Sequence, residues 1–139
     1  MTTVDPLAAL VAYLKADSAV AALASARVYG AELAPAEATS MPRHAVVCYA
    51  TGGQPEHYVK LQAPRVDVMC YGPTPYEAKR LYLTVYDALK GAEREEQTSA
   101  LIHTALMNGG PLQNREPDTH WPFVWSSWTV TVSEESTVS

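Results

Sequence analysis

The segment at residues 65–91, RVDVMCYGPTPYEAKRLYLTVYDALKG, changes from a strand pattern to a helix pattern across one short turn. Val66, Val68 and Cys70 occupy alternate positions, which is the period of a half-buried strand. Gly72 and Pro73 follow at once and are expected to end that strand. The segment therefore predicts a strand that leads directly into a helix.

The predicted helix has clear signals at both ends. Thr74 is in the N-cap position, Pro75 in the first helical position, and Glu77 comes three residues after the cap. The apolar residues that follow with helical spacing are Ala78, Leu81, Tyr82, Val85 and Leu89. Gly91 is expected to end the helix in a left-handed conformation.

Weaker patterns cover the rest of the chain. A first helix is expected after the N-cap Asp5, and a second short turn after Asp17 or Ser18. Further strands are expected at residues 27–29, 44–50, 56–62, 100–107 and 123–132. The connections are expected at residues 31–42 (irregular), 51–55 (a turn), 63–64 (a break at Ala63-Pro64), 92–99 (a charged connection) and 108–120 (a polar loop). We expect Ile102, Thr104 and Leu106 on one strand face, and a bulge near Ser126-Ser127 to reconcile two apolar phases.

This order of elements resembles the phage tail-terminator, or tail-completion, family. The residues that match its strand and its E-A-x-x-L helix are Arg65, Val66, Asp67, Val68, Glu77, Ala78, Leu81, Ala88, Leu89 and Gly91. The resemblance implies a structural virion protein of the tail or neck. It would form a ring, expected to be a hexamer, that caps the tail tube, stops tube polymerisation and joins the tail to the head–neck connector. The implied partners are other copies of the chain, the tail-tube protein and the connector or stopper protein.

The patterns and the resemblance agree on an α+β fold. We expect a largely antiparallel β-sheet, with an N-terminal helix and one long helix packed on one face, and a protruding hairpin. A length of 139 residues predicts a single domain over residues 1–139, with a frayed tail at 133–139. The fold is expected to be soluble, because no run reaches the roughly 18 apolar residues of a membrane span. No signal peptide is expected, since the N-terminus lacks a basic stretch and Asp5-Pro6 interrupts any early apolar run. Assembly in the host cytoplasm follows from the resemblance.

Charge argues against a dedicated nucleic-acid binder. The formal net charge is −5, whereas such proteins concentrate basic residues on one face. A mildly acidic wall would suit a channel through which DNA passes without specific binding, although mild acidity is also a common solubility feature. Cys48 and Cys70 fall in the same phase of two apolar strands and are expected to be reduced core residues, with a disulfide as the less favoured alternative.

Catalytic, cofactor-binding and metal-binding residues are not expected. His44 and Cys48 lie four residues apart in a predicted strand, where they would stand about 13 Å from each other, too far to bind one ion. Cys70 and His103 on neighbouring strands would form a nucleophile–base pair, but no acid partner or oxyanion donor accompanies them. We therefore predict that the protein is not an enzyme.

Two segments are candidates for contact with partners. Tyr76 and Leu83 project from the predicted long helix opposite its apolar stripe, beside Lys79 and Arg80, and we expect these four residues to form a subunit interface. The predicted hairpin arm carries candidates for contact with the tail tube or another partner, namely His57, Tyr58, Lys60 and Gln62. The alternative for each is an ordinary solvent-exposed face or sheet hairpin.

Two other functions remain open on sequence grounds. The first is another head–tail neck component, such as a head-closure or connector protein of similar size. The second is a small enzyme or ligand-binding module in which Trp121, Trp125 and Trp128 form a pocket wall.

Overall fold

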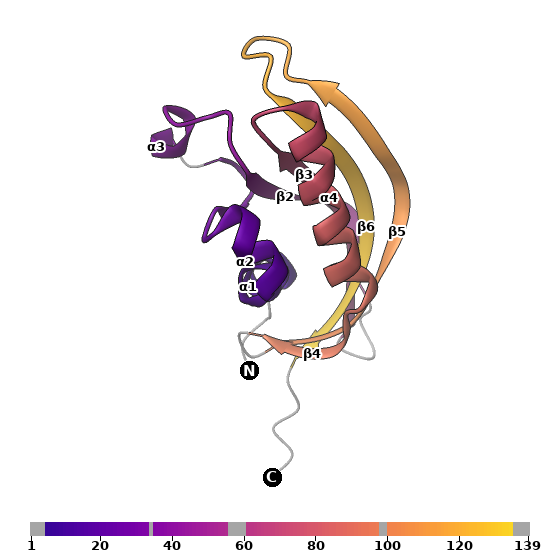
Figure 1. Ribbon diagram of the computed structural model, residues 1–139. Coiled ribbons are helices and arrows are strands. Elements are labelled where there is room, and N and C mark those ends of the chain that lie inside the picture. Colours follow the sequence, from indigo (N-terminus) through magenta and orange to yellow (C-terminus); the bar gives the residue numbers. More distant parts are fainter. Residues whose placement is uncertain (1–4, 34, 56–60, 98–99, 135–139) are drawn as a thin grey trace.

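One six-stranded β-sheet with helices against it forms the protein (Figure 1). The computed structural model describes residues 5–33, 35–55, 61–97 and 100–134. The helices are α1 (Pro6–Ala16), α2 (Ser18–Ala24), α3 (Pro35–Ala38) and α4 (Pro75–Lys90). The strands are β1 (Val28–Gly30), β2 (Ala45–Pro55), β3 (Leu61–Tyr71), β4 (Glu93–Gln97), β5 (Ala100–Arg115) and β6 (Pro122–Glu134).

The sheet has the strand order β1-β2-β3-β6-β5-β4. β1 runs parallel to β2, and every other neighbouring pair is antiparallel. Helices α1, α2 and α4 lie on the inner side of the curved sheet, as Figure 1 shows. The predicted α+β class, with a largely antiparallel sheet and the long helix on one face, is confirmed.

The helices begin where the sequence predicts. Asp5 caps α1 by accepting hydrogen bonds from the amides of Leu7 and Ala8, and Asp17 caps α2 in the same way. Among the described residues, no single helix is long and apolar enough to cross a membrane; α1 and α2, bent by 84° at their junction, have that length and composition only when taken together. Tyr13 donates a hydrogen bond of 2.6 Å to the carbonyl of Ala88, which joins α1 to the end of α4. Both edge strands, β1 and β4, contact α1, so this helix bridges the two edges of the curled sheet.

The main core lies between the helices and the inner face of the sheet. Its largest fully buried side chains include Leu10 and Leu14 of α1, Leu81 and Leu89 of α4, and Trp128 of β6. Val66, Val68 and Cys70 of β3 are also fully buried on this face, as their alternation predicts.

The turn from β3 into α4 depends on Gly72. A Cβ at this position would lie 2.4 Å from the backbone nitrogen of Ala78, so only glycine lets the chain pass this close to the first turn of α4. The amide of Glu77 donates to Oγ1 of Thr74, which confirms the predicted N-cap. The predicted left-handed stop at Gly91 is wrong: its φ is −85° and its ψ is −3°. The helix instead ends in a 3₁₀-type turn, in which the amide of Ala92 donates to the carbonyl of Leu89 three residues earlier.

The hairpin strands are longer than expected. Residues 51–55 belong to β2 instead of forming a turn, and Ala63-Pro64 lies within β3 instead of breaking it. The pairing shifts by one residue between Ala50↔Val66 and Gly53↔Pro64, so β2 contains a bulge here. Pairing can therefore continue past the two glycines and the proline that suggested a turn and a break.

Residues 92–99 and 108–120, expected as connections, contribute to the sheet. Residues 93–97 form the edge strand β4, which pairs with the start of β5. Charged residues are depleted in strands in general but are common on exposed edges, which explains why the pattern missed β4. Much of the predicted loop at 108–120 belongs to β5, which continues to Arg115.

The bulges occur in β5 and not in β6. Against β3, β6 keeps one register along its whole length, whereas β5 shifts against β6 at three places. The first shift puts Ile102 and Ala105 in the core and leaves Leu106 64% exposed, so the expected shared face of Ile102, Thr104 and Leu106 is wrong. Ser126 is fully buried and accepts a hydrogen bond from the indole of Trp128. It therefore shares the core face with Trp128, and the alternation of core-facing residues in β6 continues without a bulge.

A second, smaller apolar cluster lies on the outer face of the sheet. It contains the buried Ala45, Val47 and Tyr71, and partly buried side chains that include Leu33 and Met41 from the β1–β2 connection. Tyr71 also donates a hydrogen bond of 2.6 Å to Glu116, and burial raises the pKa of this phenol. The sheet is thus covered on both faces at this end.

The β1–β2 connection is held by a buried carboxylate. Glu37 is 7% exposed and accepts two hydrogen bonds from Arg43, and Arg27 lies 3.8 Å away. The hydrogen bonds from Arg43 hold the pKa of Glu37 below its ordinary value of 4.5, with a further contribution from the charge of Arg27. A segment expected to be irregular therefore contains the helix α3 and a charge-paired anchor.

Candidate functional site

The outer surface of α4 presents the residues that the sequence singled out. Tyr76 is 74% exposed and Leu83 is 49% exposed, and Lys79 and Arg80 are exposed beside them. The opposite side of the helix, with Ala78, Leu81 and Val85, is buried against the sheet. The predicted separation into a core stripe and an exposed apolar surface is confirmed, and its use as a subunit interface stays a prediction.

Part of this surface is tied to the sheet by polar side-chain contacts. Glu77 lies 3.1 Å from Nε2 of His44, which immediately precedes β2, and 3.3 Å from Arg80. Arg27 donates to the backbone carbonyl of His44, so this network reaches β1. Arg80 is therefore held in place, whereas no ion pair within the described residues involves Lys79.

The second group of candidate residues falls largely outside the described residues. His57, Tyr58 and Lys60 lie outside the described residues, so their contact with a partner stays a prediction. Gln62 lies in β3, where its backbone faces Pro55 of β2 on one side and Val132 of β6 on the other. At this position the strand is part of the six-stranded sheet and not of a free hairpin arm.

The outer face of the sheet carries an apolar row that the sequence analysis did not predict. Tyr29, Val47, Met69, Trp125 and Leu112 are successive cross-strand neighbours from β1 to β5. The small apolar cluster covers the β1 end of this row, whereas Leu112 at the β5 end is 53% exposed. The signal was hidden because Leu112 lay in a presumed loop, so its alignment with Trp125 was not visible.

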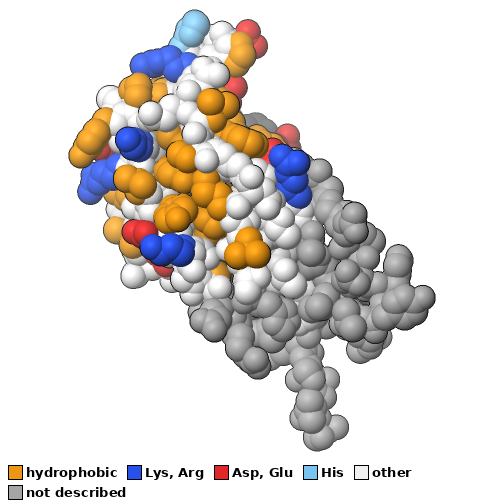
Figure 2. Space-filling view, turned by 90° about the vertical axis from the view of Figure 1, so that its right-hand side faces the viewer, with side chains coloured by type: hydrophobic (Ala, Val, Ile, Leu, Met, Phe, Trp, Pro, Cys, Tyr) orange, Lys and Arg blue, Asp and Glu red, His pale blue; other side chains and the backbone are white. Residues whose placement is uncertain are grey.

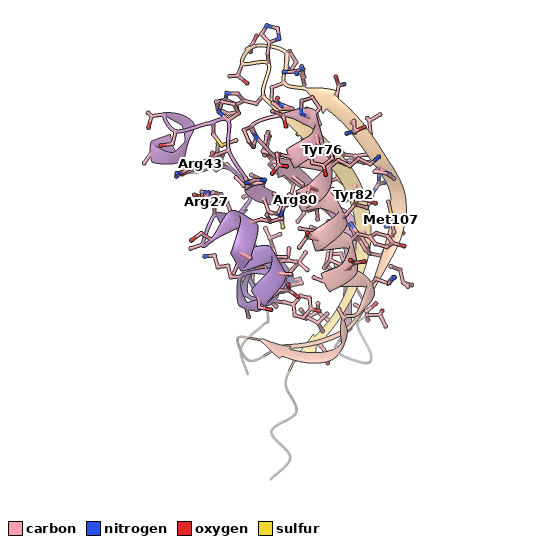
Figure 3. The ribbon with its side chains drawn as sticks, viewed as in Figure 1. Arg27, Arg43, Tyr76, Arg80, Tyr82 and Met107 are labelled. Carbon is pink, nitrogen blue, oxygen red and sulfur yellow. The ribbon has the colours of Figure 1, made fainter. Side chains whose placement is uncertain are left out.

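Exposed apolar residues continue around the edge of β5. Figure 2 shows hydrophobic side chains gathered on the side of the molecule where β5 lies, with Lys and Arg side chains around them. Leu106 and Leu112 are the large exposed apolar residues of β5 among the described residues. Tyr82 of α4 reaches Met107 of β5, with 3.8 Å between its hydroxyl oxygen and Sδ (Figure 3). The surfaces of α4 and β5 are therefore continuous.

The three tryptophans do not form a pocket wall. Trp128 is 2% exposed in the main core, where its ring lies 5.8 Å from that of Tyr86. Trp121 instead packs edge-on against Tyr71 in the small outer cluster, and Trp125 also belongs to the outer face. A shallow hollow near the start of α4 is lined by Pro75, Gln113, Asn114, Arg115 and Phe123, and by none of these indoles.

The suggested cysteine chemistry has no geometric basis. Cys48 and Cys70 are free and fully buried, and burial raises the pKa of Cys48 to about 12. The pKa of Cys70 is raised for the same reason, so neither thiol is a ready nucleophile. The expectation that Cys70 and His103 lie on neighbouring strands is wrong, because β6 lies between β3 and β5. Within the described ranges, no three His, Cys, Asp or Glu residues are grouped so that they could hold a metal ion.

Comparison with known proteins gives a family and a fold. One solved structure with a similar fold, a chain from "Virion of native gene transfer agent (GTA) particle", has a TM-score of 0.63 and 18% identity. The similarity covers 91% of this chain and 93% of the other. No curated protein matches the chain. The family described as "Tail completion protein gp17" matches residues 8–131. Because this match spans most of the sequence, the chain belongs to the tail completion protein gp17 family and is a structural protein of the virion tail.

Proposed function

We propose that the protein is a tail terminator, which assembles into a closed ring at the end of the tail tube. The observation that carries the proposal is the family match over residues 8–131. In this role the ring stops tube polymerisation and provides the surface that joins the tail to the head–neck connector. The work is done by binding surfaces, and it requires no catalytic group, metal or cofactor.

A ring made of identical subunits needs two different surfaces on each subunit that bind each other. The exposed face of α4, with Tyr76, Lys79, Arg80 and Leu83, is the first candidate, because its apolar side chains lie off the core stripe. Apolar residues at the centre and charged residues at the rim are typical of protein interfaces. A ring of six copies is the arrangement we propose.

The remaining partners are the tail-tube protein and the connector or stopper protein. The segment with His57, Tyr58, Lys60 and Gln62 is proposed to contact the tube or the neighbouring subunit. DNA would pass through the lumen of the ring without specific binding, in keeping with the net charge of −5.

Deletion of the gene that encodes this protein tests the proposed function. If the protein is a tail terminator, electron micrographs should show tail tubes of uncontrolled length, and tubes of normal length after the gene is restored. Tails of normal length together with heads that lose their DNA would instead identify a head-closure or connector protein and overturn the proposal.

A further inference from the structure

The continuous surface of α4 and β5 has the properties of one half of a contact between subunits. We infer that it binds the glutamate-rich edge strand β4 of a second copy of the chain. The inference rests on the ring proposed above, for which it names both contacting surfaces. From here on, "the α4–β5 surface" means Tyr76, Lys79, Leu83 and Lys90 of α4 with Leu106, Met107, Leu112 and Arg115 of β5.

The first observation is that most of β5 lies at an edge of the sheet. β4 pairs with β5 only between Thr104 and Ala100. Beyond Thr104, β5 has β6 on one side and no strand among the described residues on the other. The remainder of β5, as far as Arg115, is therefore open to a partner on that side.

The form of this edge favours contact through side chains. Pro111 has no amide hydrogen to donate, and β5 contains all three register shifts against β6. Such interruptions prevent a second strand from pairing continuously with the edge. Apolar side chains flank it instead: Leu106 is 64% exposed and Leu112 is 53% exposed.

The second observation is that α4 and β5 form one surface. Besides the contact between Tyr82 and Met107, the side chain of Gln113 lies 3.5 Å from the carbonyl of Pro75. Tyr76 therefore stands beside the open edge (Figure 3), and the exposed Leu83 is carried by the same helix, which is fixed to β5 at these two contacts. Large apolar side chains exposed on adjoining elements are typical of an interaction site.

The third observation is a local reversal of charge. The cations of α4 and β5 are Lys79, Arg80, Lys90 and Arg115, and their carboxylates are Glu77 and Asp87. Glu77 and Arg80 pair with each other, and Glu77 also contacts His44, which leaves Lys79, Lys90 and Arg115 against Asp87. This surface is therefore cationic, although the whole chain has a net charge of −5. The rest of the chain is correspondingly acidic, which makes a second copy an electrostatically complementary partner.

β4 is the acidic element that fits best. It carries Glu93, Glu95 and Glu96 with Arg94, and it forms one end of the strand order. The α4–β5 surface and β4 are different surfaces of one subunit, so contact between them is of the head-to-tail kind that generates rings. Opposite charges also set the orientation in which two subunits meet.

Paired charge reversals test the contact in the full-length protein. One variant carries Lys79→Glu and Lys90→Glu, a second carries Glu95→Lys and Glu96→Lys, and a third combines all four changes. Lys15→Glu on α1 is the matched control, because this exposed lysine lies outside both surfaces. Subunit association is measured by sedimentation, and thermal melting confirms that each variant is folded. Leu106→Asp provides a second disruption of the α4–β5 surface, in case reversal at Lys90 lowers stability.

We expect each pair of reversals to weaken association at least about tenfold, and the combined variant to recover it, because attraction is restored with opposite signs. Normal association of both pair variants and of Leu106→Asp would overturn the contact while leaving the ring intact. Failure of the combined variant to recover would overturn the assignment of β4. A ring that forms normally but no longer binds tail tubes would assign the surface to the tube protein and overturn the inference. A wild-type chain that never associates would contradict the ring itself.

Discussion

The hydroxyl of Tyr82 on α4 lies 3.8 Å from Sδ of Met107 on β5, at the margin between the buried core and the outer surface. On the core side of this contact, α4 packs on β3, β5 and β6. On the outer side, the exposed residues of the helix adjoin the open edge of β5. The same helix therefore stabilises the subunit and presents a surface for assembly, and single substitutions can separate these roles.

Substitutions at Leu81 and Leu83 should have opposite consequences. Leu81 is fully buried, so Leu81→Asp places an unpaired charge in the core and should destabilise the fold by about 3–5 kcal/mol. Leu83 is 49% exposed, so Leu83→Asp should change stability by no more than about 0.5 kcal/mol. It should nevertheless abolish assembly, because the charge would be buried in the interface. Thermal melting and sedimentation of both variants check this, and normal assembly of Leu83→Asp would remove this face from the interface.

Glu37 should make folding stability depend on acid. Hydrogen bonds from Arg43 lower the pKa of Glu37 in the folded protein, so its stabilising contribution is fully present above the unfolded value of 4.5. That contribution is lost as the pH falls through the lowered folded value. Glu37→Gln should lower the melting temperature near pH 7 and reduce the further loss between about pH 5 and pH 3. An unchanged acid dependence in the variant would mean that other carboxylates dominate.

Glycine should be required at position 110 but not at position 91. Gly110 has a φ of +94°, and a Cβ there would lie 2.7 Å from the carbonyl oxygen of Trp125. Gly110→Ala should therefore destabilise the protein by about 1–3 kcal/mol. Gly91 has an ordinary helical conformation with room for a Cβ, so Gly91→Ala should be neutral or stabilising by up to about 1 kcal/mol. Equal melting temperatures for the two variants would contradict this account of β5.

The backbone amides of residues 56–60 should gain protection from hydrogen exchange on assembly if this segment contacts a partner. Hydrogen exchange of its backbone amides, compared between the free subunit and the tail-bound ring, measures this change. Protection should increase at residues 56–60, whereas Gln62, which lies between two neighbouring strands, should be protected in both states. Equal protection of residues 56–60 in both states would remove the segment from the list of contacts.

The sequence predicted elements best where several local signals agreed. Asp5 and Thr74 cap helices as expected, and Asp17, one of the two residues considered, caps α2, because an N-cap depends on residues within one turn. The strand containing Val66, Val68 and Cys70 was equally clear, since these three alternate residues are fully buried. The exposed face of α4 followed directly from helical geometry.

The errors share a physical cause, which is that sheet pairing overrides local propensity. Gly53, Pro64 and Pro111 suggested turns or breaks, yet each lies in a strand beside or within a register shift. Glu93 and its neighbours suggested a connection, but charged residues are stable at a sheet edge. The same errors concealed the open edge of β5, because Leu106 was expected to share a strand face with Ile102, and Leu112 was expected in a loop.

Native mass spectrometry of the purified full-length protein tests the central claim most directly. A tail terminator with a head-to-tail interface predicts one closed oligomer, expected to contain six copies, with no larger species as concentration rises. Leu83→Asp should convert that oligomer to folded monomers. A wild-type protein that stays monomeric at all concentrations, or that forms an open series of growing oligomers, would contradict the proposed ring.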